Sequence, residues 1–236
     1  MTMIEVNLQT VHARLAAACR AAGREAGDVT LLAVSKTFGP EAVAQAWAAG
    51  QTAFGENYIQ EAVQKISQLR QLSDPARAPL QWHCIGPVQS NKTRLVAEHF
   101  DWVQTVDRLK IAQRLSEQRP PGLPPLQVCI QVNVDGGPAK SGVLPPEALA
   151  LARQVAALPG LRLRGVMSIP EPAPDFETAC AVFAQVKAVF DALNAQGLAL
   201  DTLSMGMSAD LEAAIHAGST LVRVGTAIFG GRPRPA

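Results

Sequence analysis

The sequence contains little cysteine, and its few cysteines stand far apart. Among 236 residues there are four, Cys19, Cys84, Cys129 and Cys180, and none belongs to a Cys-x-x-Cys pair. Zinc and iron–sulfur sites need cysteines at close spacing, and a disulfide framework needs them at high density. We therefore expect neither a metal site nor a disulfide scaffold. A chain of this length buries roughly 70% or more of its surface on folding and needs no such support.

An excess of one charge and long apolar runs are also lacking. The 21 basic and 20 acidic residues give a net charge of +1 and form no basic block, which argues against nucleic acid as a partner. No apolar run approaches the roughly 20 residues that span a bilayer. The N-terminal stretch MTMIEVNLQTVHARL carries polar residues too early for a signal peptide. We expect a cytoplasmic protein with no membrane partner.

The apolar pattern predicts strands and helices in alternation. An amphipathic helix is expected from Ile4 to Ala26, ending near Gly27. After it, short apolar runs such as TLLAVS, QWHCIG and TLVRVG alternate with predicted helices at 40–49, 57–72, 89–98, 107–118, 145–158, 174–196 and 208–217. Pro40 and Asp175 are typical of helix starts. Such alternation predicts a parallel sheet with right-handed crossovers.

Roughly eight such units indicate an α/β fold, a (β/α)8 TIM barrel, as one domain over residues 1–236. Only a short tail, TAIFGGRPRPA, follows the last predicted strand. We therefore expect the N-terminal helix to cover the gap left by a missing final helix. A doubly wound open sheet is the alternative.

A lysine ends the first predicted strand. The run LLAVSKT, residues 31–37, reads as a strand buried on both faces that ends in Ser35 and Lys36. One interpretation is an ordinary lysine whose stem lies along apolar surface while its amine reaches water. The other is chemical, because apolar walls disfavour the ammonium form, lower its pKa and leave a nucleophilic amine that can form an imine.

An arginine interrupts the last predicted strand. Arg223 stands between Val222 and Val224 in TLVRVGTAIFGG, and burying an unpaired guanidinium is costly. Either it pairs with a carboxylate or it faces a ligand at the barrel mouth. Gly225 and Thr226 favour the ligand, because glycine lets the backbone approach it and threonine adds a hydroxyl donor. Barrels often bind phosphate with the loops after strands seven and eight.

The seventh predicted strand leads into a second turn suited to an anion. In LSMGMSADLEAAIHAG, Gly206 precedes Ser208, which fits the N-cap of a helix running to about His216. Amides at a helix N-terminus bind anions, and the alternative interpretation is that Ser208 caps only its own helix. Asp210 and Glu212 then fall in the first turn, where the helix dipole favours acidic residues.

Three features now converge on neighbouring strands of a closed barrel. They are an imine-forming lysine on the first strand and a phosphate cup with an arginine on the seventh and eighth. A ligand with an aldehyde and a phosphate joins all three, and pyridoxal 5′-phosphate (PLP) is the candidate. His83 lies within a strand, and we expect it to be a hydrogen-bonded core residue and not a ligand. His12, His99 and His216 show no metal spacing.

Seven segments resemble one known family over almost the whole chain. They are AVSKT, FGENYIQEA, WHCIGPVQSNK, AKSG, LRLRGVMSIP, LSMGMSADLEAAI and STLVRVGTAIFG. The sequence resembles the pyridoxal phosphate homeostasis proteins, the YggS/PROSC family, which share their barrel with the N-terminal domain of alanine racemase. The resemblance implies a barrel of the alanine racemase N-terminal type with an extra N-terminal helix.

The resemblance also implies roles for individual residues. Lys36 would carry PLP as an imine, Arg223 would face the pyridine nitrogen, and Asn57 in FGENY would line the site. The phosphate would be held by Ser208, Gly225 and Thr226.

Lys140 in AKSG matches a family lysine linked to cofactor transfer, and its other interpretation is an ordinary loop lysine. Two departures from the family pattern fall at the rim of the site. Ala209 stands where relatives often carry aspartate, and DGGPAKSG is a less polar approach to Lys140 than the family pattern suggests.

The family resemblance predicts a carrier or buffer of PLP without turnover. A cationic arginine beside the pyridine nitrogen disfavours its protonation, which weakens the ring as an electron sink. Racemization by two bases needs a second acid–base group; we expect no second domain here, and the only tyrosine is Tyr58. PLP-dependent apo-enzymes would be the recipients, and we expect a monomer. A weak PLP-dependent amino-acid racemase and a cofactor-free lyase using Lys36 on a phosphorylated sugar are the alternatives.

Overall fold

Eight parallel strands close into a barrel. The computed structural model describes residues 1–71, 77–137 and 140–231. The strands follow one another around the barrel in chain order, and β1 pairs with β8, with Leu32 opposite Arg223. This closure confirms the TIM barrel and shows that the alternative, an open doubly wound sheet, is wrong. The strands are β1 (Thr30–Val34), β2 (Ala53–Glu56), β3 (Gln81–Cys84), β4 (Trp102–Val106), β5 (Leu126–Gln131), β6 (Leu161–Met167), β7 (Thr202–Met207) and β8 (Leu221–Val224).

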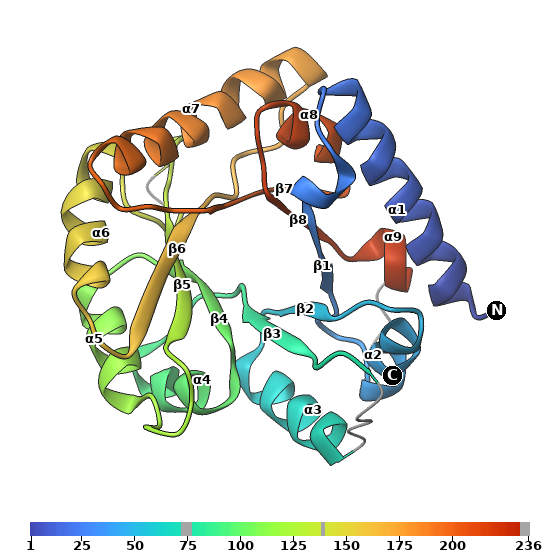
Figure 1. Ribbon diagram of the computed structural model, residues 1–236, viewed down its shortest axis with the longest axis horizontal. Coiled ribbons are helices and arrows are strands. Elements are labelled where there is room, and N and C mark those ends of the chain that lie inside the picture. The colour runs from blue at the N-terminus through green and yellow to red at the C-terminus, as the bar shows by residue number, and fades with distance from the viewer. Residues whose placement is uncertain (72–76, 138–139, 232–236) are drawn as a thin grey trace.

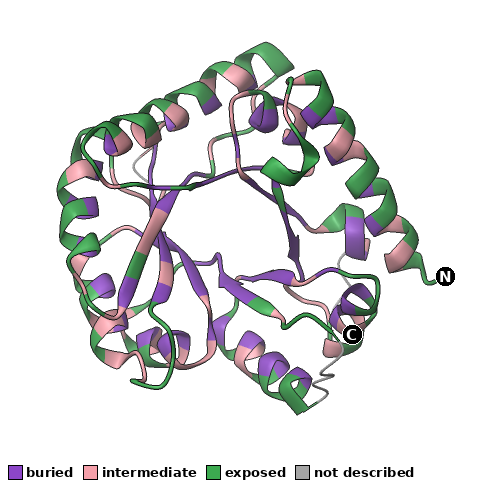
Figure 2. Cartoon of the chain, viewed as in Figure 1, coloured by how far each residue is buried: buried purple, intermediate pink, exposed green. Residues whose placement is uncertain are grey.

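Helices surround the barrel and bury their inner faces against it (Figure 1). Figure 2 shows buried residues along the strands and on the inward side of the helices, with exposed residues outside. Asp175 caps its helix as predicted, its carboxylate accepting from the Thr178 amide at 2.7 Å. The α-helices are α1 (Met3–Ala21), α2 (Pro40–Ala48), α3 (Ile59–Gln71), α4 (Thr93–His99), α5 (Leu109–Gln118), α6 (Ala148–Ala156), α7 (Phe176–Ala195), α8 (Leu211–His216) and α9 (Thr226–Phe229). Residue 72, the predicted end of the third helix, and residues 232–236 of the tail lie outside the described residues.

The N-terminal helix α1 covers the β8–β1 side of the barrel, as expected from the short tail. It packs against α2, α8 and α9, and Figure 1 shows it running beside α9. The Asn7 amide donates to the Ile228 carbonyl at 2.9 Å, which ties α1 to α9. The guanidinium of Arg14 donates twice to the Glu212 carboxylate, both at 2.6 Å, which ties α1 to α8. A short helix, α9, does follow β8, and α1 covers this side of the barrel together with it.

Helix α1 ends five residues earlier than the predicted Ala26. Gly23 adopts a φ of +66°, a left-handed conformation that costs glycine little. The Arg24 amide then donates back to the Cys19 carbonyl at 2.9 Å, which closes the helix at Ala21. The stop signal is thus Gly23, and Gly27 lies in a separate short 3₁₀ turn, Ala26–Asp28.

The barrel interior combines an apolar cluster with a polar layer. Leu32, Val34, Ala53, Ile85 and Leu221 form the cluster. The polar layer comprises His83, Gln104, Ser204 and Arg223, all buried. His83 is hydrogen-bonded to Gln81 and Gln104, which confirms the prediction that it is a core residue. Within the described ranges no helix is long and apolar enough to cross a membrane.

Candidate functional site

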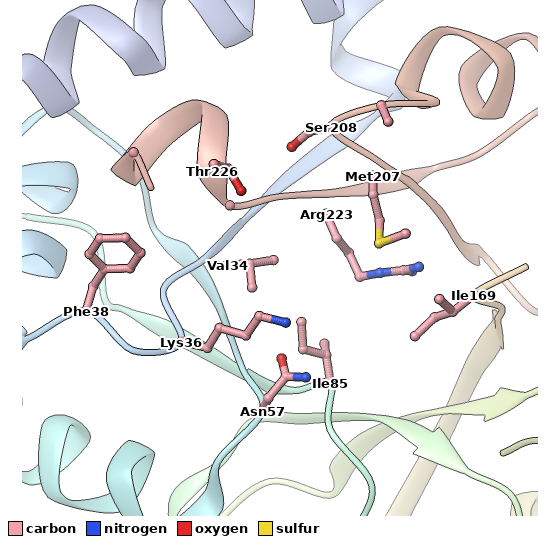
Figure 3. A pocket seen from close by; sticks show the side chains of 13 residues that line it. Val34, Lys36, Phe38, Asn57, Ile85, Ile169, Met207, Ser208, Arg223 and Thr226 are labelled. Carbon is pink, nitrogen blue, oxygen red and sulfur yellow. The ribbon is translucent and has the colours of Figure 1, made fainter. Parts of the chain in front are cut away.

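A pocket of about 320 Å³ opens at the carboxyl ends of the strands, where TIM barrels place their chemistry. All six residues predicted to bind the cofactor line it: Lys36, Asn57, Ser208, Arg223, Gly225 and Thr226. Figure 3 shows the Lys36 amine pointing into this pocket from one side and the Arg223 guanidinium entering from another. The structure thus brings together residues at and just beyond the carboxyl ends of β1, β2, β7 and β8. Apolar walls come from Val34, Phe38, Ile85, Ile169 and Met207.

Lys36 stands at a sharp turn just beyond β1. The next residue, Thr37, has a φ of +69°, which a β-branched residue seldom adopts. Two hydrogen bonds hold the turn. The Thr37 amide donates to the Glu61 carboxylate at 3.0 Å, and the Phe38 amide donates to the Ser35 carbonyl at 3.1 Å. The turn fixes where the Lys36 stem leaves the strand.

A buried ion pair lies behind that turn, and the sequence interpretation missed it. The Lys65 ammonium donates to Glu56 Oε1 at 2.7 Å and to the Ser35 carbonyl at 2.9 Å. The Ser35 hydroxyl donates to the same Glu56 oxygen at 2.6 Å. Burial raises the pKa of Glu56, against the attraction of Lys65. One signal was available, because Lys65 lies on the helix face of Ala62 and Leu69, which are apolar and buried.

Arg223 is held by neutral groups. One guanidinium nitrogen donates to the Ser204 hydroxyl at 2.6 Å, and another donates to the Ser168 carbonyl at 2.8 Å. No carboxylate is among its hydrogen-bond partners within the described chain, so the ion-paired alternative is wrong. Burial lowers the pKa of Arg223 to about 10, which leaves it cationic at neutral pH. Ser168 and Ser204 were not identified from the sequence.

The predicted N-cap at Ser208 is wrong. Helix α8 begins at Leu211, and the Asp210 carboxylate accepts from the Met207 amide at 2.6 Å, so Asp210 closes the turn. Ser208 instead lies in that turn, and its carbonyl accepts from Arg14 at 2.8 Å. Its hydroxyl and that of Thr226 turn toward the same part of the pocket in Figure 3.

Glycines shape both of the turns that were predicted to bind a phosphate. Gly206 has a φ of +93°, and a Cβ there would lie 2.3 Å from the Ala214 Cβ, so only glycine lets β7 end against α8. A Cβ on Gly225 would lie 3.2 Å from the Val34 carbonyl oxygen. Part of the reason for glycine at position 225 is therefore close packing on β1, apart from any ligand.

Asn57 carries a buried side-chain oxygen with no hydrogen-bond partner. The residue lines the pocket, and its Oδ1 accepts no hydrogen bond from the described chain. Buried polar atoms are normally satisfied, so this one has capacity for a ligand donor. Gly86 packs against the Asn57 backbone, where a Cβ would come within 2.3 Å of its carbonyl oxygen. This close backbone packing fixes the position of the Asn57 backbone.

Lys140 lies at the rim, in a second cavity of about 250 Å³ that shares Asn57, Ile85 and Ile169 with the first. Its ammonium is 2.6 Å from Asp135 and 3.0 Å from Glu171. Burial lowers the pKa of Lys140, but the hydrogen bonds to those carboxylates outweigh it and leave the pKa raised. Ala139 of the AKSG segment and Pro138 lie outside the described residues. Across the described part of the chain, no group of three His, Cys, Asp or Glu residues could hold a metal.

Comparison with protein families gives one match over nearly the whole chain. The family model described as "Alanine racemase, N-terminal domain" matches residues 6–233. A curated relative, the pyridoxal phosphate homeostasis protein of Pseudomonas aeruginosa, is 57% identical and covers 98% of this chain and 97% of its own. The protein of the same name from Escherichia coli is 52% identical, with 98% of each chain covered.

Solved structures share the fold. PipY of Synechococcus elongatus, with PLP bound, is 35% identical with a TM-score of 0.81, covering 96% of this chain and all of its own. An alanine racemase of Clostridium difficile has a TM-score of 0.72 at 16% identity and covers 98% of this chain, which spans 57% of that enzyme. At that identity the likeness shows the fold alone.

Proposed function

The chain belongs to the pyridoxal phosphate homeostasis proteins, whose barrel is that of the alanine racemase N-terminal domain, and on this premise we propose that it binds PLP through Lys36. It acts in intracellular PLP homeostasis as a carrier or buffer of the cofactor, without turnover. We also propose that residues 1–236 work as a single PLP-binding barrel domain. The PLP-bound structure of PipY, 35% identical, supports the ligand.

The observation that carries the proposal is the shared pocket. Lys36, the two hydroxyls of Ser208 and Thr226, and Arg223 line one cavity although they come from opposite ends of the chain. When bound, PLP supplies an aldehyde that reacts with primary amines and a phosphate that accepts hydrogen bonds. The donor set fits this group, since hydroxyls suit the phosphate and the unpartnered Asn57 oxygen suits a polar ring substituent.

Each residue of the pocket then has a definite task. The Lys36 amine attaches the cofactor, and the strained turn after it keeps that amine inside the pocket. Ser208 and Thr226 donate to the phosphate, with Gly225 bringing the start of α9 against β1. Arg223 has only donors, so a pyridine nitrogen held beside it would have to accept and would carry no proton. An unprotonated ring withdraws electrons weakly, which favours holding the cofactor over turnover.

The composition of the pocket also supports a carrier. Lys36 and Arg223 are the titratable residues among those that line it in the described chain. Tyr58, the only tyrosine of the sequence, is 53% exposed and is not among the lining residues. Two-base racemization needs a proton donor on each face of the bound amino acid. The pocket offers one lysine, which supports binding and release.

The same proposal includes the recipients of the cofactor, the cellular compartment and the oligomeric state. PLP-dependent apo-enzymes receive the cofactor when their own lysine displaces Lys36. All four cysteines are free thiols, which supports a reducing compartment such as the cytoplasm. The carrier acts as a monomer, which size-exclusion chromatography at several protein concentrations tests.

The experiment that tests the function has two arms. Purified protein is loaded with PLP and mixed with a PLP-dependent apo-enzyme, whose recovered activity measures transfer. In parallel, the loaded protein is incubated with single enantiomers of several amino acids and the products are separated by chiral chromatography. Transfer without racemization supports the carrier. Sustained racemization overturns it, and a colourless protein that never takes up PLP supports the cofactor-free lyase instead.

A further inference from the structure

A chain of hydrogen bonds crosses the barrel interior from Arg223 toward the opposite end of the strands. Arg223 donates to Ser204 Oγ at 2.6 Å, and Ser204 Oγ donates to Gln104 Oε1 at 2.6 Å. Gln104 Nε2 lies 2.9 Å from His83 Nδ1, and His83 Nε2 lies 3.0 Å from Gln81 Oε1. The first four residues are buried, and Gln81 is exposed at the start of β3. Four strands, β8, β7, β4 and β3, contribute to the chain.

With the Gln104 amide oriented as in the structure, the hydrogen bonds run in one direction. A guanidinium only donates, so the Ser204 oxygen accepts from it, and the Ser204 hydroxyl donates in turn to Gln104 Oε1. With its oxygen so occupied, Gln104 turns its NH₂ group to His83, whose Nδ1 must accept. The single ring proton of a neutral His83 therefore sits on Nε2 and is donated to Gln81. Every donor points away from Arg223.

The surroundings of His83 agree with a neutral ring. The imidazole stacks on the Trp102 indole at 5.0 Å between centroids, with 8° between the planes. The Arg164 guanidinium lies over the Trp102 ring, 4.8 Å from the ring centroid, and pairs with Asp201. Burial lowers the pKa of His83 to about 3. No carboxylate contacts the ring in the described chain, so nothing there favours a second proton.

The consequence for Arg223 is a fixed cation with no carboxylate hydrogen-bonded to it in the described residues. Oriented dipoles present their oxygen ends to the buried guanidinium, which stabilises its charge as an ion pair would, but without neutralising it. Two of its five N–H donors are used by Ser204 and Ser168, and these bonds set the orientation of the group. Figure 3 shows the guanidinium extending into the pocket in that orientation.

We propose that Ser204, Gln104 and His83 are positioning residues, whose one-way chain holds Arg223 cationic and correctly oriented toward the ring nitrogen of PLP. This rests on the proposed function, because the task of Arg223 is defined by the bound cofactor. The chain does more than fill the barrel with satisfied polar groups. It sets how strongly the ring nitrogen resists a proton, and hence the electronic state of the bound cofactor.

Gln104→Met tests the chain, because methionine keeps the volume but can neither accept from Ser204 nor donate to His83. Gln51→Met is the matched control: Gln51 is also buried, but it donates to the Leu31 and Ala53 carbonyls and has no link to Arg223. We expect Gln104→Met to weaken PLP binding about 5-fold and to shift the pH midpoint of the visible spectrum of the loaded protein, with Gln51→Met unchanged in both. An unaltered PLP affinity and spectrum in Gln104→Met would show that the hydrogen-bond chain has only a structural role.

A second measurement uses wild-type protein without cofactor, so it does not depend on the variant folding. Nitrogen-15 NMR of the histidine rings should show His83 neutral at pH 7 with its proton on Nε2. A proton on Nδ1, or a cationic ring, would reverse the chain and overturn the proposal. Borohydride trapping on wild type distinguishes failure of the proposed function from failure of the proposed hydrogen-bond chain. If Lys36 is not labelled, the proposed function fails, whereas the tautomer of His83 still decides whether the chain has the stated direction.

Discussion

The Lys65 ammonium lies 2.7 Å from the Glu56 carboxylate, and both side chains are at most 3% exposed. This pair also binds the hydroxyl and carbonyl of Ser35, the residue before Lys36. The end of β1 is therefore anchored from behind by charges that have no access to water. The second Glu56 oxygen has no partner in the described chain, so the pair is only partly compensated.

Lys65→Met should destabilise the protein by about 3–5 kcal/mol, because it leaves a buried carboxylate unpaired. Urea unfolding measures this. Lys187→Met is the control, since Lys187 and Asp191 form an exposed pair worth at most about 1 kcal/mol. Because burial already raises the pKa of Glu56, the loss should be smaller at pH 5 than at pH 8, as the orphaned carboxyl takes up a proton. Equal losses in the two variants would contradict the assignment.

His83 should make the protein acid-sensitive. The pKa of His83 falls from 6.5 to about 3 on folding, so below pH 6.5 the imidazole is protonated in the unfolded chain but stays neutral in the folded protein. The contribution of neutral His83 to the free energy of unfolding is fully present above pH 6.5 and is lost as the pH falls toward 3. Against His83→Gln, which keeps an acceptor for Gln104, wild type should lose roughly 3 kcal/mol more between pH 7 and pH 4. Parallel stability curves for the two proteins would refute this.

Gly206→Ala should disturb both stability and the site. Alanine is strained at a φ of +93°, and its Cβ would lie 2.3 Å from that of Ala214. We expect a loss of about 1–3 kcal/mol and weaker PLP binding, because the turn that carries Ser208 must move. Gly122→Ala, where a Cβ meets no atom within 4 Å, should change stability by less than about 0.5 kcal/mol. Thermal unfolding and PLP titration distinguish the two.

Ser208→Ala and Thr226→Val should each weaken PLP binding about 10-fold, the usual effect of losing a hydrogen bond to a charged group. Pyridoxal, which lacks the phosphate, should bind both variants as it binds wild type. Ser67→Ala serves as the control, because it removes an exposed hydroxyl on α3 that donates to the Val63 carbonyl and does not line the pocket. If pyridoxal binding fell as much as PLP binding, these hydroxyls would not be phosphate ligands.

The sequence predicted the barrel and assembled its six candidate residues because these features are local or periodic. Lys36 and Arg223 each break an apolar run, and position within a barrel strand then places them at the mouth. The family resemblance added Asn57. Their placement in one pocket follows once the barrel closes. Their contacts with the cofactor stay a prediction.

The supporting residues were not predictable, because their partners are distant in the chain. Ser204 meets Gln104 across 100 residues, and nothing near either position indicates the contact. The Ser208 cap was mistaken for a similar reason. Ser208 and Asp210 are both good capping residues, and in the structure the helix begins after Asp210, whose carboxylate accepts from the Met207 amide. Local patterns predicted elements, but hydrogen bonds inside the barrel depend on closure.

The most direct test is the location of the covalent link. Protein incubated with PLP is reduced with borohydride, digested and sequenced by mass spectrometry, beside Lys36→Ala treated in the same way. We expect one phosphopyridoxyl group on the peptide that contains Lys36 and none in the variant at equal PLP. Labelling of Lys36→Ala at the wild-type level, on Lys140 or elsewhere, would contradict the account.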